Sequence, residues 1–286
     1  MFIKFAELQQ RRKFSLSLFL YINMEFPFAL QVGSNKILLH TILESAAYFI
    51  GFRYFLYVRK RQGDTITTSN RIWILIASIF GAVAGSRLVG GLEDITALQA
   101  AVNKPLFFYQ NKTVLGGLLG GLVVVELVKK LIKEKRSSGD LITYPFILAL
   151  IIGRIGCFSM GVHEATYGLQ TSLPWGINLG DGIVRHPVCL YEIVFLATTW
   201  ILIARLEKKF VLTDGSRFKI FMIAYLSFRF MLDFIKPHYT FNIGLSTIQI
   251  AALLGLFYYA DEIFHPNKLS CKRLRWQEEI GGAREA

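Results

Sequence analysis

Long apolar runs separated by shorter polar connections are the main pattern along this chain. A helix needs about 20 mostly apolar residues to cross a bilayer, and several runs approach that length. They lie at 37–58, 72–92, 114–132, 141–160, 188–205, 218–235 and 243–264. The pattern predicts an all-α, polytopic membrane protein with about seven transmembrane helices.

Lysine and arginine are concentrated in every second connection. The basic strings are RKRQGDTITTSNR, KKLIKEKRSS and RLEKKFVLTDGSRFK between segments, and KLSCKRLR after the last segment. The other connections hold only Lys104, Lys112, Arg185 and Lys236. Positive charge marks the cytoplasmic side of a membrane protein. The sequence therefore predicts that the first helix starts on the outer side and that the C-terminus is cytoplasmic.

Composition agrees with a membrane protein and removes one competing interpretation. Of the 286 residues, 53% are hydrophobic and 18% are charged, whereas a soluble domain is closer to about a quarter charged. The net charge of +12 could indicate a nucleic-acid partner, but topology and anionic lipid account for it. We expect the lipid bilayer as a partner and no nucleic acid.

The chain divides into three parts on this basis. Residues 1–23 form a leader of uncertain status, since Arg11, Arg12 and Lys13 precede a short apolar run without a convincing cleavage site, and Met24 could be the true start. Residues 24–265 form the predicted transmembrane domain, and 266–286 form a basic cytoplasmic tail. The outer loop 161–187 is rich in Gly, Pro and aromatic residues. We expect this loop to fold over the outer mouth of the bundle.

Two arginines share a similar depth inside predicted membrane segments. Arg154, in ALIIGRIGCFSMG, is about 9 Å inside the outer end of its helix at 1.5 Å per residue, and Arg229, in SFRFMLDF, lies at a similar depth. A charge at membrane depth costs at least about 2.5–3.5 kcal/mol, so it marks a partner or a function. Two guanidiniums facing one cavity would suit a phospholipid phosphate. The alternatives are a structural salt bridge for Arg154 and an intrahelical pair of Arg229 with Asp233, four residues on.

The string RHPVCLYE opens the fifth segment with further ionisable groups. Glu192 is an intramembrane acid that needs a cation or a proton. Tyr191 precedes it, and His186, just outside the helix, can exchange protons near neutral pH. His163 and Glu164, in the outer loop, are weaker candidates.

Glycine-rich strings occur in the second and third segments. VLGGLLGGL contains Gly116 and Gly117, and GAVAGSRL ends near Arg87. Small residues allow close helix packing, but bare backbone could also let a lipid headgroup approach, so these three residues are candidates for substrate binding. Glu44, in the first segment, could serve only to neutralise one of the arginines.

The three cysteines, Cys157, Cys189 and Cys271, are too few and too scattered for a disulfide framework or a zinc site. We interpret each as a small buried residue. The sequence also lacks a P-loop or zinc-ligand spacing, so neither a metal nor another cofactor is expected. From the residues alone, an outward-facing polar cavity could belong to a lipid-modifying enzyme or to an anion transporter. The absence of clear internal symmetry weakens the transporter interpretation.

Several strings, in this order, resemble the signature region of the prolipoprotein diacylglyceryl transferases: GRIGCFSMG, TSLPWG and RHPVCLYE. GAVAGSRL, GGLLGG, FRFMLDF and LSTIQI resemble other landmarks of that family, and the resemblance covers roughly residues 25 to 264. It implies a multi-pass enzyme of the bacterial cytoplasmic (inner) membrane with its active site towards the outer face. Such an enzyme transfers a diacylglyceryl group from phosphatidylglycerol to the lipobox cysteine of a prolipoprotein signal peptide and releases glycerol-1-phosphate.

The resemblance also implies roles for individual residues. It places Arg154 and Arg229 near the lipid phosphate, and it matches Glu192 and Asp233 to the family's acids. Three departures stand out. Leu115 occupies a position where many members have His, Cys157 occupies one where many have Asn, and GVHEATYG differs from the commoner NGE…G form. Without that His, the general base could be His163, His186 or Glu192, and a divergent paralogue with another lipid donor, another acceptor or no activity remains an alternative.

Overall fold

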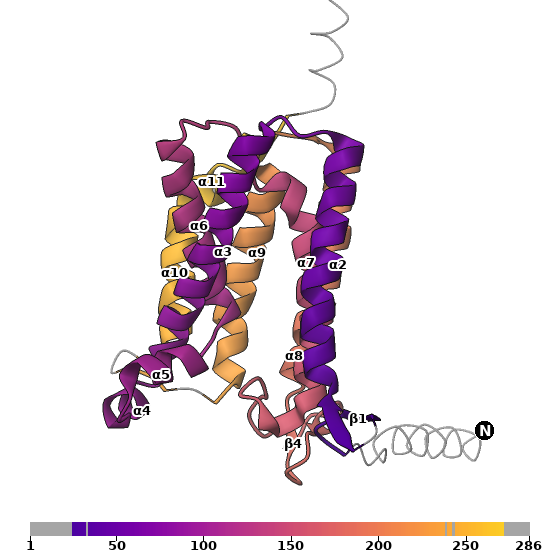
Figure 1. The fold of residues 1–286 in the computed structure, drawn as a ribbon, viewed down its shortest axis with the longest axis vertical. Coiled ribbons are helices and arrows are strands. Elements are labelled where there is room, and N and C mark those ends of the chain that lie inside the picture. Colours follow the sequence, from indigo (N-terminus) through magenta and orange to yellow (C-terminus); the bar gives the residue numbers. More distant parts are fainter. Residues whose placement is uncertain (1–24, 33, 238, 242–243, 272–286) are drawn as a thin grey trace, which may run out of the picture.

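The computed structural model describes residues 25–32, 34–237, 239–241 and 244–271. Long helices run side by side as a bundle, with short helices and hairpins at its two ends (Figure 1). The long helices are α2 (Leu39–Gln62), α3 (Thr68–Gly91), α6 (Val114–Leu131), α7 (Asp140–Met160), α8 (Val188–Lys209), α9 (Ser216–Leu232) and α10 (Thr247–Tyr258). The short helical elements are α4 (Ile95–Ala100), α5 (Lys104–Gln110), η1 (Gly161–His163), η2 (Asp233–Ile235), α11 (Ala260–Phe264) and η3 (Pro266–Leu269).

Each predicted apolar segment contains a helix, so the mostly helical architecture is confirmed. Two helices run beyond their predicted ends, α2 to Gln62 and α8 to Lys209, because basic residues in a last turn interact favourably with the helix dipole. The predicted segment 243–264 is wrong in extent. Its helix begins only after Ser246, whose side chain and that of Gln249 form a capping box, and it gives way to the short α11.

Among the described residues, three helices are long and apolar enough to cross a membrane by length and composition: Thr68–Gly91, Asp140–His163 and Val188–Lys209. Large apolar side chains also face outwards on other helices, including Phe49 on α2 and Phe257 on α10, which are 68% and 80% exposed. A soluble monomer rarely exposes so much apolar surface. These features are those of a membrane protein, while seven spans and the side on which each terminus lies stay predictions.

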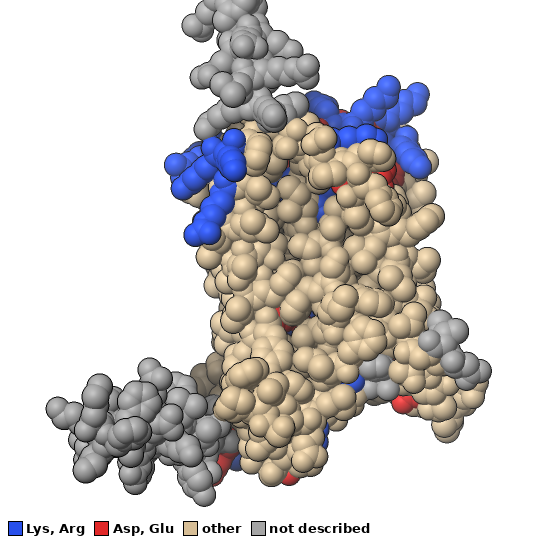
Figure 2. Space-filling view, turned by 180° about the vertical axis from the view of Figure 1, so that it is seen from behind, with Lys and Arg blue, Asp and Glu red and all other residues tan. Residues whose placement is uncertain are grey.

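Charge separates the two ends of the bundle. Lysine and arginine gather at the end where α2 finishes and α3 begins, above a wide band with few charges (Figure 2). Strands β5 (Val211–Leu212) and β6 (Ser270–Cys271) pair at this end. The opposite end carries the hairpins β1 (Ala29–Val32) with β2 (Asn35–Leu38) and β3 (Ile177–Asn178) with β4 (Val184–Arg185). The predicted leader, 1–23, and most of the basic tail lie outside the described residues.

Helices α3 and α6 touch through glycines. A methyl group at Gly81 would lie 2.5 Å from the carbonyl oxygen of Gly120, and one at Gly116 would lie 2.6 Å from Val89 Cβ. Close packing is therefore a requirement at Gly116. At Gly117 the nearest atom would be 3.4 Å away, so packing alone does not demand glycine there.

The buried apolar core lies among α6, α7, α8, α9 and α10. Leu115, Ile147, Phe221 and Tyr225 are fully buried in it. Leu115 is thus a core residue, and it packs against neighbouring side chains where it stands.

Candidate active site

One buried carboxylate joins two buried guanidiniums between three helices. Glu192 Oε1, from α8, lies 2.8 Å from Arg154 Nε of α7, and Glu192 Oε2 lies 3.1 Å from Arg229 Nη1 of α9. Tyr225, also on α9, donates its hydroxyl to Glu192 Oε1 at 2.7 Å. The two arginines and the glutamate are 7%, 4% and 1% exposed. We call these four residues the Arg–Glu–Arg site.

The local sequence explains why these side chains meet at one depth. Arg154 stands six residues before the end of α7, Glu192 stands four residues after the start of α8, and Arg229 stands three residues before the end of α9. At 1.5 Å per residue, each lies about 5–9 Å inside the same end of the bundle. Tyr225 is four residues before Arg229, so both project from one face of α9.

The four residues of the Arg–Glu–Arg site carry a net charge of +1, since one carboxylate faces two guanidiniums. Beside Arg229, Asp233 adds one negative charge and Lys236 one positive charge, so the balance is unchanged. Burial makes an uncompensated charge costly, so the site favours a further anion. Arg229 Nε is buried and has no hydrogen-bond partner within the described part of the chain. A guanidinium has five N–H donors in a planar fork, and phosphate oxygens suit that geometry.

The loop 161–187 is fastened across the end of this site. Leu169 N donates to the carbonyl oxygen of Ile235 at 2.8 Å, beyond α9, and Val162 N donates to the carbonyl oxygen of Leu179 at 3.1 Å. Arg185 binds Asp181 Oδ2 through Nε at 2.8 Å, and this contact lowers the pKa of Asp181. These bonds hold the loop against the ends of α7 and α9.

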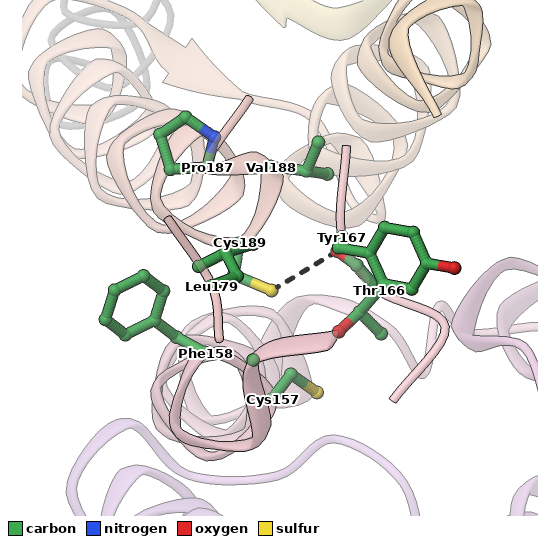
Figure 3. Close-up of a pocket in the computed structure, with 9 residues that line it drawn as sticks. Cys157, Phe158, Thr166, Tyr167, Leu179, Pro187, Val188 and Cys189 are labelled. Atoms are coloured by element: carbon green, nitrogen blue, oxygen red, sulfur yellow. Dashed lines mark hydrogen bonds between the residues drawn. The ribbon is translucent and has the colours of Figure 1, made fainter. Parts of the chain in front are cut away.

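His186 and Tyr191 form a polar group of their own at the base of that loop. His186 Nδ1 lies 3.2 Å from the Tyr191 hydroxyl, which accepts a hydrogen bond from Trp175 Nε1 at 2.8 Å. A small pocket of about 10 Å³ lies nearby, between Cys157, Cys189 and the loop residues Thr166 and Tyr167 (Figure 3). Room of this size holds about one water molecule.

Comparison with known proteins identifies the family. A family model described as prolipoprotein diacylglyceryl transferase matches residues 27–261. The chain belongs to the prolipoprotein diacylglyceryl transferase family. This confirms the resemblance that the motifs carry.

Three relatives named phosphatidylglycerol–prolipoprotein diacylglyceryl transferase illustrate the similarity. The protein from Campylobacter hominis is 31% identical, over 73% of this chain and 81% of its own length. The protein from Bordetella parapertussis is 29% identical, over 73% and 82%. The protein from a Wolbachia sp. (subsp. Brugia malayi) is 30% identical, over 74% and 84%. The chain is thus similar to these transferases over most of their length.

Within this diacylglyceryl transferase, the structure brings some of the predicted residues together and separates others. Arg154, Arg229 and Glu192 meet, as do His186 and Tyr191. Asp233 lies close enough to Arg229 to interact with it electrostatically, and the other candidates lie elsewhere. The Arg87 guanidinium stacks 4.9 Å above the ring of Tyr109 on α5, and Gly116 packs on α3. Asp233 also accepts a hydrogen bond from Ser246 Oγ at the cap of α10.

One of the alternatives left open by the sequence can be corrected. Glu44 does not neutralise an arginine in the described structure. Its Oε1 lies 3.1 Å from Lys112 Nζ and its Oε2 lies 3.5 Å from His40 Nε2. Arg229 pairs with Glu192 of the neighbouring helix. The charge of Arg229 is therefore not balanced by an intrahelical pair with Asp233 alone. The expectation of a buried residue is confirmed for Cys189, whereas Cys157 is only half-buried.

Sequence reasoning missed Tyr225, His40 and the surroundings of Cys157. Tyr225 has a recognisable signal, because it precedes Arg229 by one helical turn. His40 Nδ1 lies 3.3 Å from Glu164 Oε2, and Cys157 Sγ lies 3.6 Å from Arg154 Nη1. No periodicity brings the first turn of α2 to the end of α7, so that contact had no sequence signal.

Proposed function

We propose that this chain transfers a diacylglyceryl group from phosphatidylglycerol to the lipobox cysteine of a prolipoprotein and releases glycerol-1-phosphate. Membership of the transferase family supports this reaction. The observation that carries the mechanism is the pair of buried arginines that share Glu192. The net positive charge of that site matches the charge that the reaction must accommodate.

The lipid phosphate is the natural ligand of the Arg–Glu–Arg site. The phosphodiester of phosphatidylglycerol carries one negative charge, which would neutralise the net +1 of the site. Arg229 Nε, which is buried without a hydrogen-bond partner among the described residues, is available to one of its oxygens. Acyl chains can stay in the bilayer, because apolar side chains cover the outside of the bundle.

The same two arginines would assist bond breaking. The acceptor sulfur forms a bond to the glyceryl carbon while the bond from that carbon to the phosphate oxygen breaks. The departing phosphate monoester then gains a second negative charge. Donors placed in advance where charge develops contribute about 2.7–4 kcal/mol each to the lowering of such a barrier. Glu192 keeps the guanidiniums in position and makes a poor proton acceptor, since two cations and a hydroxyl already bind it.

We place the reaction on the outer side of the bacterial inner membrane. Lysine and arginine gather at the end of the bundle away from the Arg–Glu–Arg site, and basic residues favour the cytoplasmic side. A signal peptide exported across the membrane presents its lipobox cysteine on the outer side. Arg87, Gly117, Tyr191, His186 and Asp233 stay predicted substrate-binding or catalytic residues.

A product assay tests this function. Purified protein is mixed with phosphatidylglycerol and a synthetic lipobox peptide, and the peptide mass is followed together with glycerol-1-phosphate. We expect the peptide to gain one diacylglyceryl group, and a peptide with serine in place of the lipobox cysteine to gain none. Folded protein that leaves the peptide unchanged, beside an active transferase under the same conditions, would refute the proposal. Accumulation of a labelled anion in liposomes without a covalent product would favour the transporter.

A further inference from the structure

Three potential metal ligands from distant parts of the chain meet beside Arg154. They are His40 in the first turn of α2, Cys157 near the end of α7 and Glu164 just after η1. One donor atom from each residue lies within 4.8 Å of the other two. His40 Nδ1 is 3.3 Å from Glu164 Oε2, and Cys157 Sγ is 4.0 Å from Glu164 Oε1. We call these residues the His–Cys–Glu cluster.

The helix packing builds this cluster. Helices α2 and α7 approach at Gly156, where a methyl group would lie 3.3 Å from Leu43 Cβ and 3.4 Å from His40 Nδ1. Glycine at this position therefore lets the imidazole reach the thiol of the next residue, Cys157. The turn after α7 then returns Glu164 to the same place.

Two of the facing atoms lack a hydrogen bond. His40 Nδ1 and Glu164 Oε2 are buried and form an ion pair at 3.3 Å, yet neither makes a hydrogen bond among the described residues. Buried polar atoms normally make hydrogen bonds. When the imidazole is neutral, its nitrogen and the facing carboxylate oxygen offer lone pairs to a shared cation.

We propose that the His–Cys–Glu cluster binds a thiophilic divalent cation of the Zn²⁺ class. Imidazole, thiolate and carboxylate are the ligands that Zn²⁺ takes in proteins, and three protein ligands leave a fourth, open position. With metal–ligand bonds of about 2.0–2.3 Å, tetrahedral ligands lie about 3.3–3.8 Å apart. The donor atoms of the three residues lie within 4.8 Å of one another, so metal binding would draw them together by about 1 Å or less.

The second ring nitrogen of His40 also has a partner. Glu44 Oε2 lies 3.5 Å from His40 Nε2. A carboxylate behind a ligating histidine fixes its tautomer and orientation, and removing it typically weakens metal binding about 10–100-fold. Glu44 would therefore support the ligand without touching the metal.

The open position would take the acceptor thiol, a step that rests on the proposed function. Coordination to zinc removes the proton of a thiol outright, which supplies the thiolate nucleophile without a histidine next to the α6 glycines. The sulfur then forms the bond to the glyceryl carbon, the carbon–oxygen bond breaks, and its electron pair goes to the phosphate oxygen. The thiol proton released on coordination passes to water, and the phosphate monoester leaves with a second negative charge. Arg154 Nη1 lies 3.6 Å from Cys157 Sγ, so the metal and the phosphate would be neighbours.

Metal content and the spectrum of a cobalt form test the site independently of activity. The protein is purified through a tag without histidine and without chelators, and bound metals are counted. Metal-free protein is then titrated with Co²⁺ and followed by its thiolate-to-cobalt charge-transfer absorption. We expect about one zinc per chain and a cobalt–thiolate band, with both lost in Cys157→Ser and His40→Ala. Cys189→Ser is the matched control for a thiol outside the cluster, and His163→Ala is the control for a histidine; both should keep metal and band.

Other variants separate this inference from the proposed function. Arg229→Ala should lose transfer and keep its metal, and Glu44→Gln should weaken cobalt binding by about 10–100-fold. A lipobox peptide should change the cobalt–thiolate absorption, whereas its serine analogue should not. Absence of both metal and cobalt band, or metal that Cys157→Ser and His40→Ala leave in place, would overturn the site, even if transfer is normal. Bound metal without an effect of the cysteine peptide would overturn the open position alone.

Discussion

Replacing Glu192 by glutamine tests whether one carboxylate holds the two arginines together. Opposite charges about 3 Å apart attract by about 5–6 kcal/mol at an effective dielectric constant of about 20, and Glu192 lies 2.8 Å and 3.1 Å from its two partners. Desolvation offsets much of this attraction, but leaving the partners buried and uncompensated costs about 3–5 kcal/mol. We expect the Glu192→Gln protein to lose stability by that amount.

Thermal unfolding in detergent, followed by tryptophan fluorescence, measures the loss. One kcal/mol corresponds to about 2–4 °C for a domain of 150–250 residues, so the expected decrease is about 6–20 °C. Glu207→Gln is the control on the same helix. Its carboxylate pairs with Arg217 Nε at 2.5 Å but is 26% exposed, against 1% for Glu192, so water screens the change and the decrease should be smaller.

An anion should compensate for the missing carboxylate. Two uncompensated guanidiniums bind phosphate more strongly than a pair that Glu192 already neutralises in part. Phosphatidylglycerol should therefore raise the unfolding temperature of Glu192→Gln more than that of the unmodified protein, and diacylglycerol, which lacks the phosphate, should not. Equal responses of the two proteins to phosphatidylglycerol, or a Glu192→Gln protein that unfolds within about 2 °C of the unmodified one, would refute this electrostatic account.

Three further substitutions test packing and charge at other positions. Gly81→Ala should destabilise the protein by about 1–3 kcal/mol, because its methyl group would lie 2.5 Å from a carbonyl oxygen of α6. Gly153→Ala, which meets nothing within 4 Å, should stabilise it by up to about 1 kcal/mol, and equal unfolding temperatures would contradict the packing argument. At the basic end, hydrogen bonds from Arg136 and Asn70 lower the pKa of Glu134 from 4.5 to about 2. The stability that Glu134 adds is thus present above pH 4.5 and lost as the pH falls towards 2. The difference in unfolding temperature between Glu134→Gln and the unmodified protein should shrink as the pH falls from about 6 to about 3, and a constant difference would speak against this pair.

Hydrophobic patterning predicted the helices because a helix that crosses a bilayer needs a continuous stretch of about 20 apolar residues. It failed at the last segment, where the capping box of Ser246 and Gln249 decides where the helix starts. A cap depends on local hydrogen bonds rather than on apolar content. Averaging hydropathy along the chain therefore gives the existence of such a helix but not its ends.

The candidate site was predictable where a charge stood out against an apolar background. Arg154, Arg229 and Glu192 each break an apolar segment, and the cost of burial made them candidates. The sequence did not show that Glu192 bridges both arginines, since the pairing depends on how α7, α8 and α9 pack. His40 gave no signal for the same reason, because Cys157 and Glu164 lie more than a hundred residues away in the chain.

The most direct test of the central claim is the transfer rate per folded molecule in Arg154→Ala and Arg229→Ala. Arg71→Ala is the control, because Arg71 is a buried arginine, 3% exposed, paired with Asp64 at the opposite end of the bundle. We expect each site variant to lose about 10²–10³-fold in rate, while Arg71→Ala keeps its rate per folded molecule. Full transfer activity in both Arg154→Ala and Arg229→Ala would contradict the account.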